Sequence, residues 1–233
     1  MNIAIDGPGG AGKSSVAKRA AAQMGLQYMD TGAMFRAAGY ALRQKGADLD
    51  SEESVEKALD GIDISVIYDS QNQQHVLVNG QDVNGAIRTP QAGADASKAA
   101  VYPCVRRKLL ALQRRTAEKY DVIMDGRDIG TVVLPNADLK LFVTADPAER
   151  GRRRFLQLEK AGKPHPDLDT IIEEIKERDY RDTHREIAPL KQADDAVLID
   201  TTHMTEDQVV EKVCGLIEEC RAGKKAAGSR ASV

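Results

Sequence analysis

The sequence Gly7-Pro8-Gly9-Gly10-Ala11-Gly12-Lys13-Ser14 lies between a short apolar run at residues 3–5 and a segment of helical composition at residues 16–24. It matches the eight-position phosphate-loop (P-loop) pattern, and it stands where that pattern is expected, after a strand and before a helix. Glycines allow successive backbone N–H groups to turn towards phosphate oxygens, and the positive end of the helix dipole adds to the attraction. The stretch therefore predicts the start of a βαβ unit with a site for nucleotide phosphates.

The polar side chains of this loop have expected roles in binding ATP. Lys13 is expected to reach the outer phosphates, and the Ser14 hydroxyl is expected to ligate Mg2+. Ser15 already has the position of a helix residue. The predicted ATP-binding residues are Gly7, Pro8, Gly9, Gly10, Ala11, Gly12, Lys13, Ser14 and Ser15.

The same glycines also fit a second pattern. Gly7, Gly9 and Gly12 match the dinucleotide-binding fingerprint, and Asp30 follows at the distance of a ribose-binding acid. A dehydrogenase does not require Lys-Ser after the last glycine, which favours the phosphate loop over a dinucleotide site or a turn without a ligand. A guanine-reading Asn-Lys-x-Asp is absent, and the chain is short for a motor ATPase. A small-molecule kinase is therefore the leading class.

Length and composition fit one globular enzyme. A chain of 233 residues with 42% hydrophobic and 30% charged residues can form one sizeable core with an inserted subdomain. The net charge of -3 argues against a general nucleic-acid-binding surface, and no run approaches the about 18 apolar residues of a membrane span. Because the N-terminus has no charged leader and the three cysteines fit neither a metal site nor a disulfide framework, we expect a cytoplasmic protein with reduced thiols.

Apolar runs after the loop predict the rest of an α/β fold. Residues 122–124, 139–143 and 196–199 each lie between helical stretches, as buried parallel strands do. Residues 62–83 break this alternation with three short apolar runs, and the Asn79-Gly80 step favours a tight hairpin turn. We expect a small antiparallel insert there.

Residues 147–189 are helical and rich in arginine, and a glycine and two prolines at 162–166 separate two helices. This composition is typical of a mobile helical lid. From Ala222 onwards the chain lacks apolar periodicity, so a disordered tail is expected.

Three arginines of the predicted lid share one helix face. Arg178, Arg181, Asp182 and Arg185 stand at helical offsets of zero, three, four and seven. On an arbitrary helix such a face is more often solvated and paired with acids, but beside a phosphate loop it favours binding of phosphates. In a second basic run, at residues 150–154, only one or two arginines can face the donor, and we predict Arg154.

Asp125-Gly126-Arg127-Asp128 directly follows the predicted strand 122–124. Asp125 is therefore expected at the carboxyl edge of the sheet, where ligands bind in open α/β folds and where a carboxylate can hold the water shell of Mg2+. Arg127 and Asp128 project past the strand end; the alternative for them is a turn with a local ion pair.

Four motifs give the chain a resemblance to a known family. They are residues 5–14, residues 30–36 (Asp-Thr-Gly-Ala-Met-Phe-Arg), residues 125–133 (Asp-Gly-Arg-Asp-Ile-Gly-Thr-Val-Val) and residues 175–190, from Ile-Lys-Glu-Arg-Asp to Ala-Pro-Leu. From the first strand to about Cys220 the chain resembles the bacterial cytidylate kinases, which are nucleoside monophosphate kinases of the P-loop class.

The resemblance implies an α/β fold of the P-loop nucleoside monophosphate kinases, in which helices flank a parallel sheet. The core would comprise residues 1–35, 100–149 and 187–222. Residues 36–99 would form the monophosphate-binding domain with a three-stranded antiparallel insert, residues 150–186 the helical lid, and residues 223–233 the disordered tail.

The resemblance also implies phosphorylation of CMP, and of dCMP, by ATP with Mg2+ bound at Ser14 and, through water, at Asp125. Arg36, Arg127 and Arg185 would hold the acceptor phosphate, Arg178 and Asp182 the sugar, and Ser97, Arg106 and Asp128 the cytosine edge. The catalytic residues implied are Lys13, Arg127, Arg154, Arg178 and Arg185.

Two positions depart from the family pattern. Phe35 stands where a tyrosine is common, so a phenol hydrogen bond is missing while stacking on the base is retained. Thr31 stands where serine is frequent and keeps the hydroxyl. Both are expected to contact the acceptor.

The expected partners are small nucleotides alone, bound by a monomer that contacts neither nucleic acid nor membrane. The alternatives left open are a kinase for another monophosphate or a small alcohol, a dinucleotide oxidoreductase, and a non-catalytic nucleotide-dependent regulator.

Overall fold

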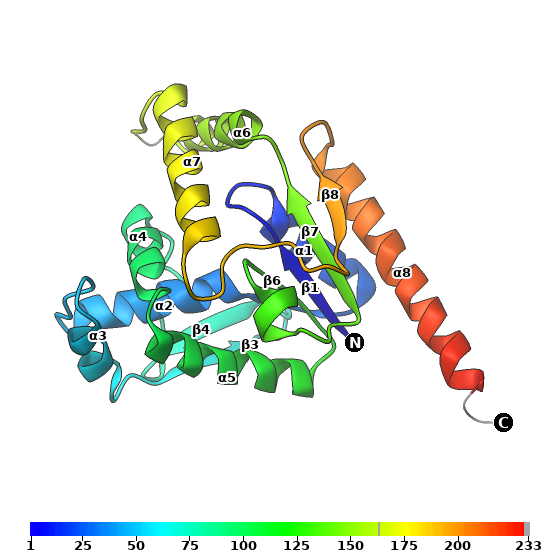
Figure 1. Cartoon of the computed structure of the whole chain (residues 1–233), viewed down its shortest axis with the longest axis horizontal. Coiled ribbons are helices and arrows are strands. Elements are labelled where there is room, and N and C mark those ends of the chain that lie inside the picture. The colour runs from blue at the N-terminus through cyan, green and yellow to red at the C-terminus, as the bar shows by residue number, and fades with distance from the viewer. Residues whose placement is uncertain (163, 231–233) are drawn as a thin grey trace.

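Within residues 1–162 and 164–230, which the computed structural model describes, five parallel strands form a central sheet in the order β2-β6-β1-β7-β8 (Figure 1). This confirms the predicted parallel sheet and adds one strand, β2, to those expected. The strands are β1 (Asn2–Asp6), β2 (Gln27–Asp30), β6 (Val122–Gly126), β7 (Leu139–Thr144) and β8 (Val197–Asp200).

The two faces of the sheet bury separate apolar clusters, because successive side chains of a strand point to opposite faces. Ile3 and Ile5 of β1 belong to a cluster with helices α1 (Lys13–Met24) and α8 (Glu206–Arg230). Ala4 belongs to the other cluster, with α2 (Thr31–Gln44) and α5 (Pro103–Lys119). The strand that leads into the loop between β1 and α1 is thus held by apolar packing on both of its faces.

A second, antiparallel sheet contains β3 (Ile64–Tyr68), β4 (Gln74–Val78) and β5 (Gln81–Asp82), as the sequence predicted. Asn79 and Gly80, with φ of 49° and 80°, form the two-residue loop between β4 and β5, which matches a type I′ hairpin turn.

The region predicted as the monophosphate-binding domain contributes to one of these two apolar clusters. Ile64 and Val76 of the insert lie in the same apolar cluster as Ala4. The helices α3 (Glu52–Leu59) and α4 (Pro90–Ala99) complete this region. Residues 36–99 therefore share an apolar core with the parallel sheet and do not form a core of their own.

The predicted lid consists of two helices, α6 (Pro147–Lys160) and α7 (Leu168–His184). The carboxylates of Asp146 and Asp167 cap them by accepting hydrogen bonds from backbone amides in their first turns. The helices can cross closely because a Cβ at Gly151 of α6 would overlap Ile172 of α7. Lys163, in the predicted interruption, lies outside the described residues.

At the C-terminus the helix α8 continues to Arg230, over most of the segment for which the sequence indicated disorder. Ala and Lys, which are frequent there, have high helix propensity. Residues 231–233 of the predicted tail lie outside the described part of the chain. In that described part, no helix combines the length and the apolar character that crossing a membrane requires.

Candidate active site

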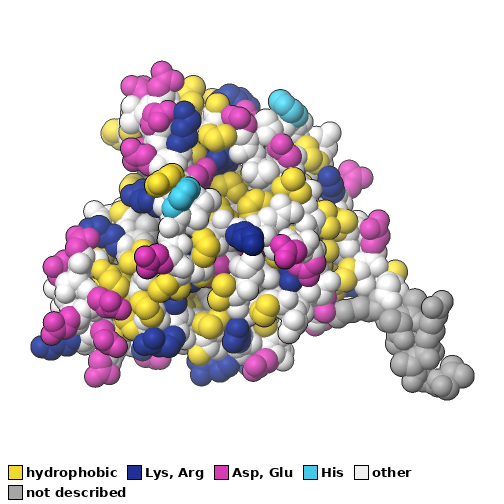
Figure 2. Space-filling view, in the orientation of Figure 1, with side chains coloured by type: hydrophobic (Ala, Val, Ile, Leu, Met, Phe, Trp, Pro, Cys, Tyr) yellow, Lys and Arg dark blue, Asp and Glu magenta, His cyan; other side chains and the backbone are white. Residues whose placement is uncertain are grey.

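Surface charge alone does not mark a site on the face shown in Figure 2, where basic and acidic side chains are interspersed. The glycine loop provides a clearer starting point. Gly10 and Gly12 have φ of 78° and 85°, a backbone region that glycine adopts without strain. Gly12 directly precedes α1, so the loop ends at a helix N-terminus with unpaired backbone N–H groups, a favourable place for an anion.

Lys13 begins α1 with a buried side chain, and its ammonium group donates a 2.6 Å hydrogen bond to the carbonyl oxygen of Pro8. Burial, followed by the nearby Arg127 guanidinium, lowers the pKa of Lys13. An incoming phosphate would counteract both effects, because its negative charge favours the charged form of Lys13.

Ser14 and Asp125 meet at the carboxyl edge of the sheet. The Ser14 hydroxyl donates to Asp125 Oδ2 at 2.7 Å, and the Tyr28 hydroxyl donates to Asp125 Oδ1 at 3.0 Å. The Thr31 hydroxyl, which is buried, donates to the backbone oxygen of Asp125 at 2.7 Å. Burial, together with the charge of neighbouring Asp30, raises the pKa of Asp125.

These oxygens fit a Mg2+ ion. Hydroxyl and carboxylate oxygens are hard ligands, and Mg2+ commonly combines one or two of them with water and substrate phosphates. Among the residues that the structure describes, no three His, Cys, Asp or Glu side chains cluster as a metal site. A cation at Ser14 and Asp125 would therefore need phosphate and water ligands, as a nucleotide complex supplies.

Two arginines from different elements face the glycine loop. A Cβ at Gly9 would lie 3.4 Å from Nη2 of Arg127 and 3.6 Å from Nη1 of Arg178, which is on α7. The Arg127 Nε also donates to Asp182 of α7 at 2.9 Å. Helix α7 therefore lies over the loop, with guanidinium groups between them.

Asp128 forms the centre of a second polar group. It pairs with Arg106, Nη1 to Oδ2, at 3.0 Å, and with Arg185, Nη2 to Oδ1, at 3.5 Å. Burial raises the pKa of Asp128 and lowers that of Arg185. The Nη2 atoms of both arginines are buried without a hydrogen-bond partner in the described structure, so this group has donors to spare for a ligand.

Of the remaining predicted acceptor residues, Phe35 lies beside this group, whereas Arg36 and Ser97 have their contacts elsewhere. The Phe35 ring centroid lies 5.5 Å from Cζ of Arg106. Arg36 Nη2 pairs with Asp30 Oδ2 at 2.8 Å, at the carboxyl end of β2. The Ser97 hydroxyl donates within α4 to the carbonyl oxygen of Gly93, at 3.2 Å.

Within the basic run on α6, the structure places Arg150 at the glycine loop and the predicted Arg154 in contact with its own helix. Arg154 is exposed and donates to Gln157 at 2.8 Å. Arg150 instead is buried, donates to the carbonyl oxygen of Gly9 at 2.9 Å and pairs with Asp179 of α7. Its only sequence signal is its place in the first turn after β7, near the sheet edge where the loop lies.

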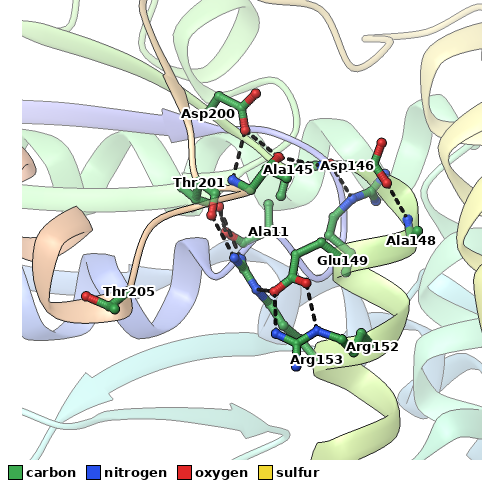
Figure 3. A network of polar contacts seen from close by, with 12 residues as sticks. Ala11, Ala145, Asp146, Ala148, Glu149, Arg152, Arg153, Asp200, Thr201 and Thr205 are labelled. Carbon is green, nitrogen blue, oxygen red and sulfur yellow. Dashed lines mark hydrogen bonds and ion pairs between the residues drawn. The ribbon is translucent and has the colours of Figure 1, made fainter.

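A further contact joins α6 to the loop (Figure 3). Arg153 pairs with Glu149 and donates to the backbone oxygen of Thr201 at 2.7 Å. The Thr201 hydroxyl lies within 3.4 Å of the carbonyl oxygen of Ala11. Helix α6, the glycine loop and the segment after β8 are therefore linked by polar contacts.

Asp6, at the end of β1, was not among the predicted site residues. Its two carboxylate oxygens accept hydrogen bonds from the backbone amides of Ile129 and Gly130, both at 2.7 Å. These amides begin the π-helical turn η1 (Ile129–Val133) directly after Asp128. Burial raises the pKa of Asp6 to about 6.

A comparison with protein families decides between the kinase classes. The family model described as cytidylate kinase matches residues 3–219. The chain belongs to the cytidylate kinase family. A cytidylate kinase from Lactobacillus gasseri is 47% identical over 221 residues, which cover 94% of each chain. A cytidylate kinase from Pseudomonas aeruginosa is 45% identical over 212 residues, 91% of this chain and 92% of that protein.

Among solved structures, a shikimate kinase from Bacteroides thetaiotaomicron covers 94% of this chain and 98% of its own, with a TM-score of 0.48 and 11% identity. Membership of the cytidylate kinase family makes the chain an enzyme that transfers a phosphoryl group from ATP. It leaves the dinucleotide interpretation of the loop glycines without support.

Proposed function

We propose that this member of the cytidylate kinase family transfers the γ-phosphoryl group of ATP directly to a phosphate oxygen of CMP, and also of dCMP. The placement of Arg127 and Arg178 beside Gly9 carries the proposal. These cations stand between the loop that would hold the donor and the residues that would hold the acceptor. Fixed positive charge at that point stabilises the charge that develops on the transferred oxygens.

The acceptor phosphate would bind to Arg36, Arg127 and Arg185. A guanidinium group offers paired N–H donors that match phosphate oxygens. The Nη2 atom of Arg185 lies 3.5 Å from Asp128 Oδ1 but has no hydrogen-bond partner in the described structure, which supports this role because a phosphate oxygen would complete its hydrogen bonding. Arg178 and Asp182 would contact the sugar, whose hydroxyls can both donate and accept.

The cytosine edge would bind to Asp128, Arg106 and Ser97. Cytosine presents an amino donor beside a ring nitrogen and a carbonyl acceptor. The Asp128 carboxylate can accept from the amino group, and the free Nη2 of Arg106 can donate to an acceptor. Phe35, next to Arg106, provides a ring on which the base can stack.

The donor triphosphate would bind to the backbone of residues 7–15 and to Lys13. Ser14, and Asp125 through water, would hold the Mg2+ ion, which neutralises phosphate charge when bound. Arg154 would approach the triphosphate as the lid closes, and Arg150 would keep the loop in shape. The phosphate of the acceptor is largely ionised near neutral pH, so no side chain has to act as a general base.

We also propose that the protein acts as a cytoplasmic monomer with small nucleotides as its partners. Its net charge of -3 gives no general attraction to nucleic acids.

A coupled assay of ADP release tests the proposal. With CMP, dCMP, UMP and AMP as acceptors, CMP and dCMP should give the highest kcat/KM. ATP binding without acceptor-dependent ADP release would indicate a regulator, and a preference for AMP would indicate a different monophosphate kinase. Lys13→Ala should lower kcat at least about 100-fold, whereas Lys18→Ala, an exposed change on the same helix, should not. Near-normal turnover of Lys13→Ala would refute the mechanism.

A further inference from the structure

A cleft lies between the antiparallel insert and α5. Its volume is about 340 Å³, and its walls include Ile67 and Tyr68 of β3 with Arg115, Lys119 and Tyr120 at the end of α5. Figure 1 shows this part of α5 below the sheet, away from α6 and α7.

This cleft is separate from the active site. Tyr120 stands two residues before Val122, the first residue of β6, whereas Asp125 lies near the other end of that strand. Three residues of strand span about 10 Å. The cleft therefore opens at the amino edge of the parallel sheet, opposite the glycine loop, and no residue of the proposed site lines it.

The cleft is positively charged. Arg115 and Lys119 are four residues apart on α5, so their side chains lie on the same helix face. In the described structure neither forms an ion pair with a carboxylate, and no Asp or Glu lines the cleft. The neighbouring Arg114, in contrast, donates to the backbone oxygens of Val132 and Val133. Arg115 and Lys119 are thus available to an anion.

The cleft also offers aromatic surface. The rings of Tyr68 and Tyr120 meet edge to face, with centroids 5.8 Å apart, and Lys119 Nζ lies 5.0 Å from the Tyr120 centroid. Ile67 is 50% exposed, and the buried Tyr68 hydroxyl has no hydrogen-bond partner among the described residues. A wholly polar ligand would leave these ring and aliphatic surfaces uncovered.

We propose that this cleft binds a small organic anion that consists of one planar ring with a carboxylate or phosphate group. The anionic group would pair with Arg115 and Lys119, and the ring would pack against Tyr68, Tyr120 and Ile67. The volume suits a single-ring ligand, because it is at the lower end of the about 300–1,000 Å³ of small-molecule sites. This site is independent of the proposed kinase reaction.

Titration of the full-length protein with phenyl phosphate, followed by NMR, tests the proposal. Arg115→Gln combined with Lys119→Gln should weaken binding about tenfold or more, because two charged contacts are lost. The control Arg107→Gln, an exposed change on α5, should leave it unchanged. If Arg178→Gln weakens binding and the double variant does not, phenyl phosphate occupies the active site and the proposal is overturned.

Probes that lack one half of the ligand test the chemistry. Phenol has the ring without the charge, and inorganic phosphate has the charge without the ring, so each should bind about tenfold more weakly than phenyl phosphate. Equal binding of inorganic phosphate would overturn the role of the ring. Benzoate replaces the phosphate by a carboxylate, and if neither benzoate nor phenyl phosphate binds, the proposal fails.

Turnover of CMP distinguishes a loss of ligand binding from misfolding of the variant, because Arg115 and Lys119 are not part of the proposed catalytic group. The double variant should keep wild-type turnover. If it unfolds, the single exposed change Lys119→Gln provides the same comparison.

Discussion

Gly7 lies so close to the backbone of Val143 that a side chain at position 7 would overlap the Val143 carbonyl oxygen. Its φ of 144° is also unfavourable for other residues. Gly12 has a similarly positive φ of 85°, but no atom lies within 4 Å of a Cβ built there. The two glycines therefore separate the effect of the clash from the effect of the backbone angle.

Gly7→Ala should lower the free energy of unfolding by more than about 3 kcal/mol or prevent folding, since backbone has to move to remove the clash. Gly12→Ala should lower it by about 1–2 kcal/mol, the effect of a left-handed backbone alone. Urea denaturation measures both. Equal losses for the two variants would contradict the importance of the contact with Val143.

Asp6→Asn should displace the backbone that carries Arg127 and Asp128. An amide side chain has one acceptor oxygen, so its NH2 group would face one of the two backbone N–H donors now bound by the carboxylate. We expect a loss of about 1–3 kcal/mol in the free energy of unfolding, together with a higher KM for CMP. Asp60→Asn, at an exposed position, is the control. An unchanged KM for CMP would exclude the positioning role.

Asp128→Asn should reduce the preference for CMP over UMP. The carboxylate accepts a hydrogen bond from Arg106, forms an ion pair with Arg185 and, as proposed, accepts from the amino group that distinguishes cytosine from uracil. We expect kcat/KM to fall for CMP by about tenfold or more and to fall less for UMP. Acceptor assays with both nucleotides measure the ratio. A parallel loss for CMP and UMP would show that Asp128 shapes the site without reading the base.

The opposite pKa shifts of Asp125 and Lys13 predict a narrow range of active pH. Because the pKa of Asp125 is above its ordinary 3.8, this carboxylate gains its proton early as the pH falls. Because the pKa of Lys13 is below its ordinary 10.5, the ammonium group loses its proton early as the pH rises. The kcat/KM for MgATP, which reports on the free enzyme, should therefore decline on both sides of neutrality.

A comparison of the wild-type enzyme with Asp125→Asn isolates the contribution of Asp125 to the loss of activity at acidic pH. The substrates titrate in the same way with both enzymes, so the ratio of wild-type to variant kcat/KM reports on Asp125. This ratio should decrease as the pH falls below neutrality, since protonation removes the charge that the variant lacks. A ratio that stays constant down to about pH 5 would argue that Asp125 keeps an ordinary pKa.

Local sequence was sufficient for most of the fold. The strands β1, β6, β7 and β8 are apolar runs bounded by turn residues, and the Asn79-Gly80 step encodes its own hairpin. The strand β2 has only Tyr28 and Met29 as apolar residues, and it forms by pairing with β6. Such a strand depends on a partner about 95 residues away, so its own composition does not reveal it.

Local sequence was less informative for the site. Helical offsets predicted Arg178, Arg181 and Arg185 on one helix face, but α7 ends at His184 and Arg181 is exposed. The rotation of α6 about its axis decides whether Arg150 or Arg154 meets the loop. That rotation depends on the crossing of α6 and α7 at Gly151. The role of Asp6 depends on amides 123 and 124 residues later, which no spacing pattern connects.

The helix α7 is joined to its neighbours mainly by charge. Among the described residues of α7, Ile171 is the buried one, while Asp179 and Asp182 pair with Arg150 and Arg127. A nucleotide phosphate that approaches Arg127 competes with Asp182 for the same guanidinium group. Substrate arrival is therefore an exchange of counterions, and the ionic strength of the medium should govern how readily the empty enzyme opens.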